Sequence, residues 1–94
     1  MPLFALHCVD KPNALALRTA TRPQHVEYIQ AAGEAIRLAG PYLDDRDGMC
    51  GSLLIIEAED LAAAQAFSAA DPYARAGLFE RVEVRPFRAG VGKL

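Results

Sequence analysis

The chain lacks several features that would assign it to a class of protein at once. It has no tryptophan and only two cysteines, Cys8 and Cys50, which do not form a Cys-x-x-Cys pair. Two cysteines are too few for a disulfide scaffold. A nucleophilic Cys50 would need a neighbour that stabilises its thiolate, and none is adjacent in sequence. We therefore expect both cysteines to be buried, reduced side chains of a cytoplasmic protein.

Long apolar runs and clusters of one charge are also missing. No run approaches the roughly 20 apolar residues that cross a bilayer. Residues 1–4 lack the basic and apolar regions of a signal peptide. The net charge is −2 and the basic residues are scattered, so no basic stripe is present to follow a phosphate backbone. We expect a cytoplasmic protein that binds neither membranes nor nucleic acids.

Sites for common cofactors are equally hard to find. The two histidines and the scattered acids have no metal-ligand spacing. No glycine-rich loop of the kind that holds phosphates is present. The sequence therefore predicts that any chemistry proceeds without a metal or an organic cofactor.

What the chain does have is an apolar surplus in a length that suits one domain, residues 1–94. Apolar residues make up 52% of the chain, above the roughly 45–50% of typical soluble proteins. Two explanations are open. The surplus could form an exposed face that a partner covers, or it could reflect the many alanines of residues 61–78, which fill helices.

Hydrophobic periodicity and turn residues predict the order of the elements. We expect strands over 3–9, 35–39, 51–57 and 78–87, and helices over 13–20, from 21 onward, from 60 to about 70, and briefly from 71 to 77. Pro23 suits the first turn of a helix capped by Thr21, so a break is expected near Arg22. Gly40 and Pro41 should end the second strand, and Asp60 should cap the later helix.

This order, strand, helix, strand, strand, helix, strand, predicts an α+β, ferredoxin-like βαββαβ fold. Such a fold has an antiparallel sheet with both helices on one face. Leu53 and Ile55 alternate with Leu54 and Ile56, so the third strand is apolar on both sides. The helices can bury only one of these sides. A second subunit related by a two-fold axis is the simplest cover for the other, and a homodimer is therefore expected.

Five short motifs follow one another along nearly the whole chain. They are Arg18 with Arg22-Pro23-Gln24-His25 and Tyr28-Ile29; Leu38-Ala39-Gly40-Pro41; Gly51-Ser52; Ala70-Asp71-Pro72-Tyr73 with Gly77-Leu78-Phe79; and Val84-Arg85-Pro86-Phe87. In order and spacing they resemble the YciI-like family. The resemblance implies a ferredoxin-like fold and a dimeric α+β barrel, in which two sheets pack face to face.

The resemblance also implies a pocket that holds a histidine and an aspartate, here His25 and Asp71. Relatives include an enzyme that removes chloride from a chlorinated hydroxyhydroquinone, and the wider superfamily includes muconolactone isomerase. Most members have no assigned reaction. The chain departs from the pattern at Ala32-Gly33, where small residues replace larger ones, and the shape of the pocket is where this departure matters.

His25 and Asp71 each have a functional and a structural interpretation. Structurally, a histidine on a helix face is more often a solvated residue or one satisfied within the core. Near a helix N-terminus the positive form of His25 would be disfavoured, leaving a neutral ring that can accept a proton. A carboxylate on the other ring nitrogen would reverse that tendency and fix the tautomer, as the acid of a catalytic triad does. Asp71 could also simply cap the helix that begins at Pro72, or it could cap and orient at once.

The remaining candidates would bind a ligand. Arg18 and Arg22 lie four residues apart, which places both guanidinium groups on one side if the helix is continuous. Such a pair suits a carboxylate or phenolate, with Arg18 as the anion anchor. Both could equally be surface charges. Ser52 could donate to a ligand or pack at a strand start. Gly51 and Tyr73 complete the candidate set, although close strand approach and packing explain them as well.

Three hypotheses follow. The first is a cofactor-independent enzyme that isomerises or eliminates on a small anionic or phenolic ring or lactone, with His25 as general acid and base. The second is a module that binds such a ligand without reaction. The third is a structural dimer in which the histidine and aspartate only pack. Side chains within hydrogen-bond reach over a concave pocket would favour the first two.

Overall fold

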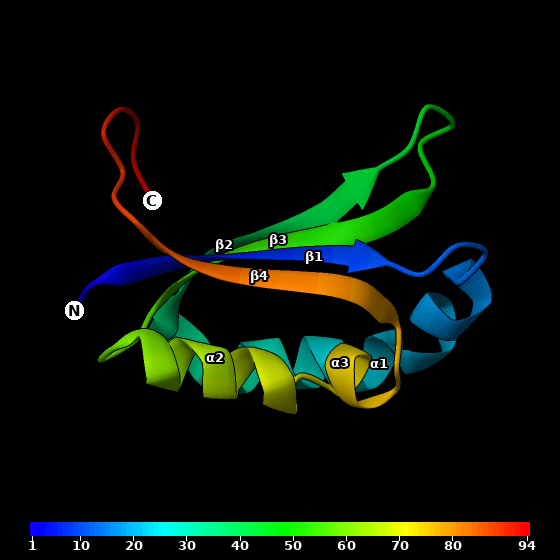
Figure 1. Ribbon diagram of the computed structural model, residues 1–94, viewed down its shortest axis with the longest axis horizontal. Coiled ribbons are helices and arrows are strands. Elements are labelled where there is room, and N and C mark those ends of the chain that lie inside the picture. The colour runs from blue at the N-terminus through cyan, green and yellow to red at the C-terminus, as the bar shows by residue number, and fades with distance from the viewer.

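The computed structural model describes residues 1–94, which form one four-stranded sheet with the helices packed beneath it (Figure 1). The elements in chain order are β1 (Leu3–Asp10), α1 (Leu15–Ala32), the 3-10 turn η1 (Gly33–Ala35), β2 (Ile36–Leu43), β3 (Met49–Glu57), α2 (Leu61–Ala70), α3 (Pro72–Arg75) and β4 (Phe79–Phe87). None of the helices combines the length and the apolar composition needed to cross a bilayer.

The strands lie in the order β2-β3-β1-β4, and every neighbouring pair is antiparallel. β1 and β3 therefore form the centre of the sheet, and β2 and β4 form its edges. The predicted α+β, ferredoxin-like βαββαβ plan is confirmed, with the short α3 added between α2 and β4.

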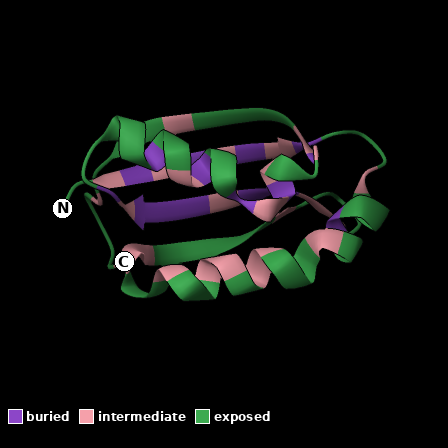
Figure 2. Ribbon diagram, turned by 90° about the horizontal axis from the view of Figure 1, so that it is seen from below, coloured by how far each residue is buried: buried purple, intermediate pink, exposed green.

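The core lies between the helices and the central strands. Side chains alternate between the two faces of a strand, and in β1 burial follows this alternation along the whole strand. Leu6 pairs with Leu54 and Phe4 with Ile56, so these four side chains share the helix-facing side, where all are buried. Ala64 of α2 packs onto them. Figure 2 shows the burial concentrated on these middle strands, while the edge strands are largely exposed.

The opposite face of the sheet has no helix over it (Figure 1). Ile55 points to this side between Leu54 and Ile56. It is buried, yet it is not part of the core cluster. Leu38 pairs with Ile55 across β2 and β3 and is 50% exposed. β3 is therefore apolar on both faces, as its sequence indicated.

α1 runs without interruption from Leu15 to Ala32, so the predicted break near Arg22 is wrong and Thr21 is not a cap. Pro23 lies inside the helix, where it removes one backbone hydrogen bond. Contacts on both sides of the proline hold the helix together. On the N-terminal side of Pro23, Arg18 is bound to Asp10. On its C-terminal side, Tyr28 donates a hydrogen bond to the Phe67 carbonyl.

β2 extends to Leu43 and does not end at Gly40-Pro41 as predicted. Pro41 pairs with Ser52 of β3. In a central strand, the missing N–H of a proline would leave a hydrogen bond of the sheet unmade. β2 is an edge strand with a neighbour on one side only, where a proline is tolerated. The position of β2 in the sheet thus allows a residue that by itself predicts a strand end.

The second half of the chain follows its predicted boundaries more closely. Asp60 caps α2, accepting a hydrogen bond from the Ala63 N–H at 2.8 Å. Gly77 follows the short α3 with a φ of 78°, a conformation that favours glycine. In β4, Val84 packs against the core, whereas Val82 two residues before it is 38% exposed, and the charged side chains between and beside them are exposed as well.

Gly51 lies where β3 passes very close to its neighbours. A Cβ atom at this position would lie 2.4 Å from the Cys8 carbonyl oxygen and 2.9 Å from Cδ2 of Tyr42. Because Gly51 has no side chain, the Tyr42 ring can lie against it, and the Tyr42 hydroxyl lies 2.8 Å from Nδ1 of His7. This glycine therefore serves the packing of three strands.

We expect Gly51→Ala to destabilise the fold, because the added methyl group would force the Cys8 backbone or the Tyr42 ring to move. The free energy of unfolding should fall by about 1–3 kcal/mol, the usual effect of overpacking. Urea unfolding followed by circular dichroism measures it. Gly40→Ala is the matched control, since a Cβ there would meet nothing within 4 Å. Equal losses in both variants would contradict this account of Gly51.

Candidate active site

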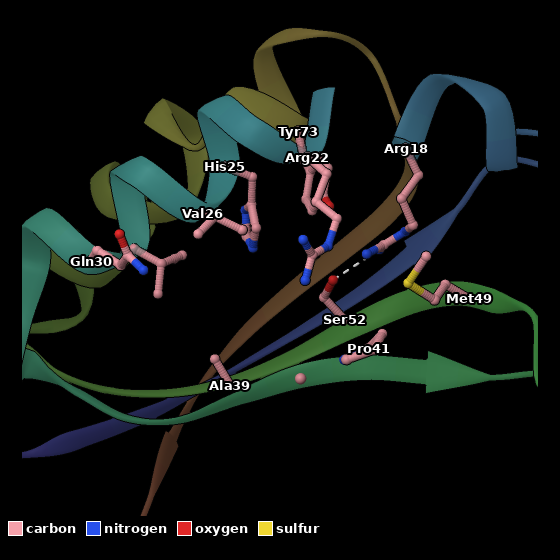
Figure 3. A pocket seen from close by; sticks show the side chains of 12 residues that line it. Arg18, Arg22, His25, Val26, Gln30, Ala39, Pro41, Met49, Ser52 and Tyr73 are labelled. Carbon is pink, nitrogen blue, oxygen red and sulfur yellow. Dashed lines mark hydrogen bonds between the residues drawn. The ribbon is translucent and has the colours of Figure 1, made fainter. Parts of the chain in front are cut away.

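A cavity of about 310 Å³ opens between α1 and the β2–β3 side of the sheet (Figure 3). This volume is at the lower end of the roughly 300–1,000 Å³ of small-molecule sites. Twelve residues of α1, β2, β3 and α3 line it: Arg18, Arg22, His25, Val26, Ile29, Gln30, Ala39, Gly40, Pro41, Met49, Ser52 and Tyr73. None of these residues is acidic.

His25 and Asp71 meet at this cavity. The imidazole Nδ1 lies 2.9 Å from one carboxylate oxygen of Asp71 and 3.1 Å from the other. An ionised carboxylate only accepts hydrogen bonds, so Nδ1 must carry the proton and donate it. Figure 3 shows the ring pointing from α1 into the space above the sheet. Nε2 is therefore the nitrogen left without a partner.

Asp71 also caps α3. One of its carboxylate oxygens accepts a hydrogen bond from the Tyr73 backbone N–H at 2.9 Å, and Pro72 occupies the first helical position. The side chain is buried, so these partners are what keeps its charge satisfied. The structural and the functional interpretation of Asp71 are therefore both compatible with one geometry.

The uninterrupted α1 changes one argument about His25. The residue lies ten positions beyond Leu15, well inside the helix, whereas the effect of the helix dipole falls off within the first turn. The expectation that a nearby helix N-terminus keeps the ring neutral is therefore wrong. The charged group in hydrogen-bond contact with the imidazole is the Asp71 carboxylate.

Tyr73 fixes the orientation of the imidazole from its other side. Its ring stacks on His25 with centroids 4.0 Å apart and planes 17° apart, and Arg18 lies 4.6 Å from its centroid. Burial raises the pKa of the Tyr73 phenol, and the charges of Arg18 and Arg22 act against this rise. Tyr73 is thus a packing residue, which is one of its two interpretations from the sequence. It also lines the cavity.

Arg18 reaches the cavity with its charge already paired. Its Nε and Nη2 groups donate to the two Asp10 carboxylate oxygens at 2.8 and 3.0 Å, and Nη2 also donates to Ser52 Oγ at 2.8 Å. Burial alone would lower the pKa of Arg18, but the hydrogen bond and charge of Asp10 outweigh it, so the pKa is raised. The guanidinium therefore stays charged inside a buried ion pair.

Asp10 did not stand out in the sequence, although a signal for it was present. It continues the series Phe4, Leu6, Cys8 at every second residue of β1 and therefore points to the helix side of the sheet. A carboxylate on that face needs a buried partner. Gln30 and Met49 also line the cavity, but neither carries a sequence pattern that would have identified it.

Arg22 is the cation of the lining that has no ion pair. It lies one helical turn after Arg18, is exposed, and extends from α1 toward the sheet (Figure 3). The predicted pair of arginines does face one cavity. Because Asp10 neutralises Arg18, the unpaired charge belongs to Arg22.

Ser52 lines the cavity, whereas Gly51 lies outside its lining. Neighbouring residues of a strand point to opposite faces, and Ser52 shares the helix-facing side with Leu54. Gly51 was predicted to bind a ligand together with Ser52. The structure gives it the strand-packing position described above instead.

Neither cysteine takes part in the site. Burial raises the pKa of the Cys8 thiol to about 12, so this side chain stays protonated and unreactive. Cys50, expected to be buried, is only half-buried near the start of β3 and contacts the Tyr42 carbonyl oxygen. Cysteine nucleophiles are therefore not part of the arrangement.

The fold has counterparts among solved structures. The chain is similar to 5-chloro-2-hydroxyhydroquinone dehydrochlorinase from Burkholderia phenoliruptrix, whose structure is a complex with 2,5-dihydroxybenzoquinone. The two are 32% identical, with a TM-score of 0.87 over 94% of this chain and 95% of the other. A crystal structure of an antibiotic biosynthesis monooxygenase is 18% identical with a TM-score of 0.58 over 95% and 98% of the chains, which is a likeness of fold alone.

The chain is also similar in sequence to bacterial proteins over most of its length. Protein YciI of Escherichia coli is 40% identical over 92% of this chain and 96% of its own length. An uncharacterized protein of Haemophilus influenzae is 37% identical over 90% and 95%. The model of the YCII-related domain matches residues 2–88. With its βαββαβ fold and a match over nearly its whole length, this chain belongs to the YCII-related family.

Proposed function

We propose that this protein is a cofactor-independent lyase or isomerase that moves protons on a small oxygenated ring or lactone. One observation carries the proposal: Asp71 holds Nδ1 of His25, so that Nε2 is left free at a cavity of small-molecule size. A histidine held in this way can take a proton and return it, and the neighbouring carboxylate stabilises the imidazolium formed in between.

The similar dehydrochlorinase suggests which reaction to test first. That enzyme removes hydrogen chloride from a chlorinated hydroxyhydroquinone, and it is 32% identical to this chain. We therefore propose dehydrochlorination, or the closely related tautomerisation of a hydroxylated ring, as the chemistry of the His25 site.

The proposed elimination balances with one acid–base group. Loss of a proton from one ring hydroxyl to Nε2 of His25 makes the ring electron-rich, and the carbon that bears chlorine takes a proton back. Loss of a proton from a second hydroxyl then expels chloride with the electron pair of its bond to carbon. Two hydroxyl protons leave and one returns to carbon, so the products are a quinone, chloride and one proton.

A second candidate is a module that binds such a ring without reaction. The unpaired Arg22 and the absence of acidic side chains in the lining favour anion binding whether or not a reaction follows. Binding without chloride release from any chlorinated hydroquinone would favour this candidate over the enzyme.

His25→Gln should abolish most of the activity, because glutamine cannot accept and return a proton. We expect kcat/KM for chloride release from 5-chloro-2-hydroxyhydroquinone to fall by roughly 10²–10⁴-fold. A chloride electrode or ion chromatography measures the release. His7→Gln is the matched control, since His7 lies outside the cavity lining. Full activity in His25→Gln would remove the proposed mechanism.

Asp71→Asn separates the orienting role of the carboxylate from capping. Asparagine caps helices well, but its amide can donate to Nδ1 and so stabilise the wrong tautomer. We expect the rate to fall by roughly 10²-fold or more, with the unfolding midpoint little changed. Asp60→Asn changes the cap of α2 alone and should leave the rate unaltered. Equal rates in the two variants would leave Asp71 with only its capping role.

We also propose that two copies pack through the sheet face that has no helix. Leu38 and Leu53 line up on this face beside Ile55, which is already buried, and covering the two leucines with a second copy would remove apolar surface from water. A two-fold axis would place the same patch on both sides of the interface.

Leu38→Glu tests the pairing of copies, because it places a charge in the apolar patch at a residue that is already 50% exposed. We expect the native chain to sediment at twice its 10.1 kDa mass and the variant to sediment as a monomer. Leu61→Glu, at an exposed leucine of α2, is the control and should leave the mass unchanged. A monomeric native chain would contradict the proposed dimer.

A further inference from the structure

We propose that Ser52 and Arg22 form a subsite for a negatively charged or carbonyl oxygen of the ligand, in which Arg18 forces Ser52 to act as a hydrogen-bond donor. The subsite deepens the proposed function, since it names the ligand class and its orientation in the same cavity. The binding it describes does not depend on whether His25 catalyses a reaction.

The direction of the Ser52 hydrogen bond follows from its partner. A guanidinium group carries donors and no acceptor, so Ser52 Oγ must accept the 2.8 Å bond from Arg18 Nη2. The hydroxyl hydrogen then has to point elsewhere, and Ser52 Oγ makes no other hydrogen bond within the chain. Because Ser52 lines the cavity, its O–H is available to a ligand there.

Arg18 cannot readily turn away and release Ser52. Its side chain is 3% exposed, its Nε and Nη2 groups are held by Asp10 at 2.8 and 3.0 Å, and it lies against the Tyr73 ring. Breaking this pair would leave a buried charge without a partner, which is strongly unfavourable. Asp10 and Arg18 are therefore positioning residues, and Ser52 is the group that meets the ligand.

Arg22 supplies the charge that Arg18 cannot. It has no ion pair, it lies one turn along α1, and Figure 3 shows it extending toward the strand that carries Ser52. With no carboxylate in the lining, nothing within the cavity competes for it. An oxyanion between these two side chains would accept two hydrogen bonds strengthened by charge.

This arrangement determines how a ligand can be oriented in the cavity, because hydrogen-bond donors and the acceptor come from different residues. Ser52 and Arg22 offer donors, whereas Nε2 of His25 offers the acceptor when the imidazole is neutral. A matching ligand carries an anionic or carbonyl oxygen for the donor side and a hydroxyl with a removable proton for the imidazole. Phenolates and enolates that carry a further hydroxyl group, and hydroxyquinones, have this pattern; neutral polyols and amines do not.

The test compares two flat rings of similar size by isothermal titration calorimetry under nitrogen. 2,5-Dihydroxybenzoquinone is a vinylogous acid, anionic at neutral pH, whereas 1,4-hydroquinone is neutral and brings two donors. We expect the native protein to prefer the quinone. Ser52→Ala should weaken quinone binding by about 10-fold or more, the effect of a hydrogen bond to a charged group. Hydroquinone binding should change little, so the preference should shrink.

Matched variants separate the subsite from general effects. Ser68→Ala removes a buried serine of α2, and Arg75→Gln removes an exposed charge of α3, both outside the cavity lining; neither should change the preference. Arg22→Gln should reduce it as Ser52→Ala does. Ser52→Thr keeps the hydroxyl and should retain it. If Ser52→Ala fails to fold, the Arg22→Gln and Ser52→Thr results decide.

The outcome is independent of turnover when the titrations are repeated in His25→Gln. A quinone preference that needs Ser52 and Arg22, without turnover of any substrate by the native protein, supports the subsite while the proposed reaction fails. Equal affinity of the native protein for both rings overturns the subsite, even if chloride release is observed. So does a preference that survives both Ser52→Ala and Arg22→Gln.

Discussion

One buried carboxylate joins the two parts of the molecule on which the site depends. Asp71 accepts the imidazole N–H of His25, 46 residues away in the sequence, and the backbone N–H that begins α3. An ionised carboxylate inside a protein needs such partners. Asp71 therefore links the end of α2 and the start of α3 to the orientation of the His25 imidazole. Tyr73 of α3 stacks on this imidazole, and the Tyr73 N–H is the one that Asp71 caps.

A second buried ion pair decides which charges the cavity presents. Two arginines one turn apart look equivalent on a helix, but Asp10 neutralises Arg18, and Arg22 is left free. The paired arginine still acts on the cavity, since it sets the direction of the Ser52 hydrogen bond. The cavity thus presents hydrogen-bond donors at Ser52 and Arg22, and a histidine whose Nδ1 is bound to Asp71.

The two prolines show where local rules gave the wrong boundaries. Pro23 predicted a helix start and Pro41 a strand end, because each removes a backbone donor. In the fold, contacts on both sides of Pro23 hold α1 together, and the edge position of β2 leaves the missing donor of Pro41 without consequence. The mistaken break in α1 also misplaced His25 near a helix N-terminus. The wrong helix boundary therefore also led to a wrong prediction of the electrostatic environment of His25.

The sequence by itself determined the order of the elements, the two-sided apolar character of β3 and the caps at Asp60 and Asp71. These depend on residue alternation and on contacts between near neighbours along the chain. The resemblance to a family singled out His25 and Asp71, but only the tertiary structure decided that they meet, that Asp10 neutralises Arg18, and that Gly51 packs strands while Ser52 faces the cavity. Each of these outcomes joins side chains from different elements, and such distances depend on how the helices lie on the sheet.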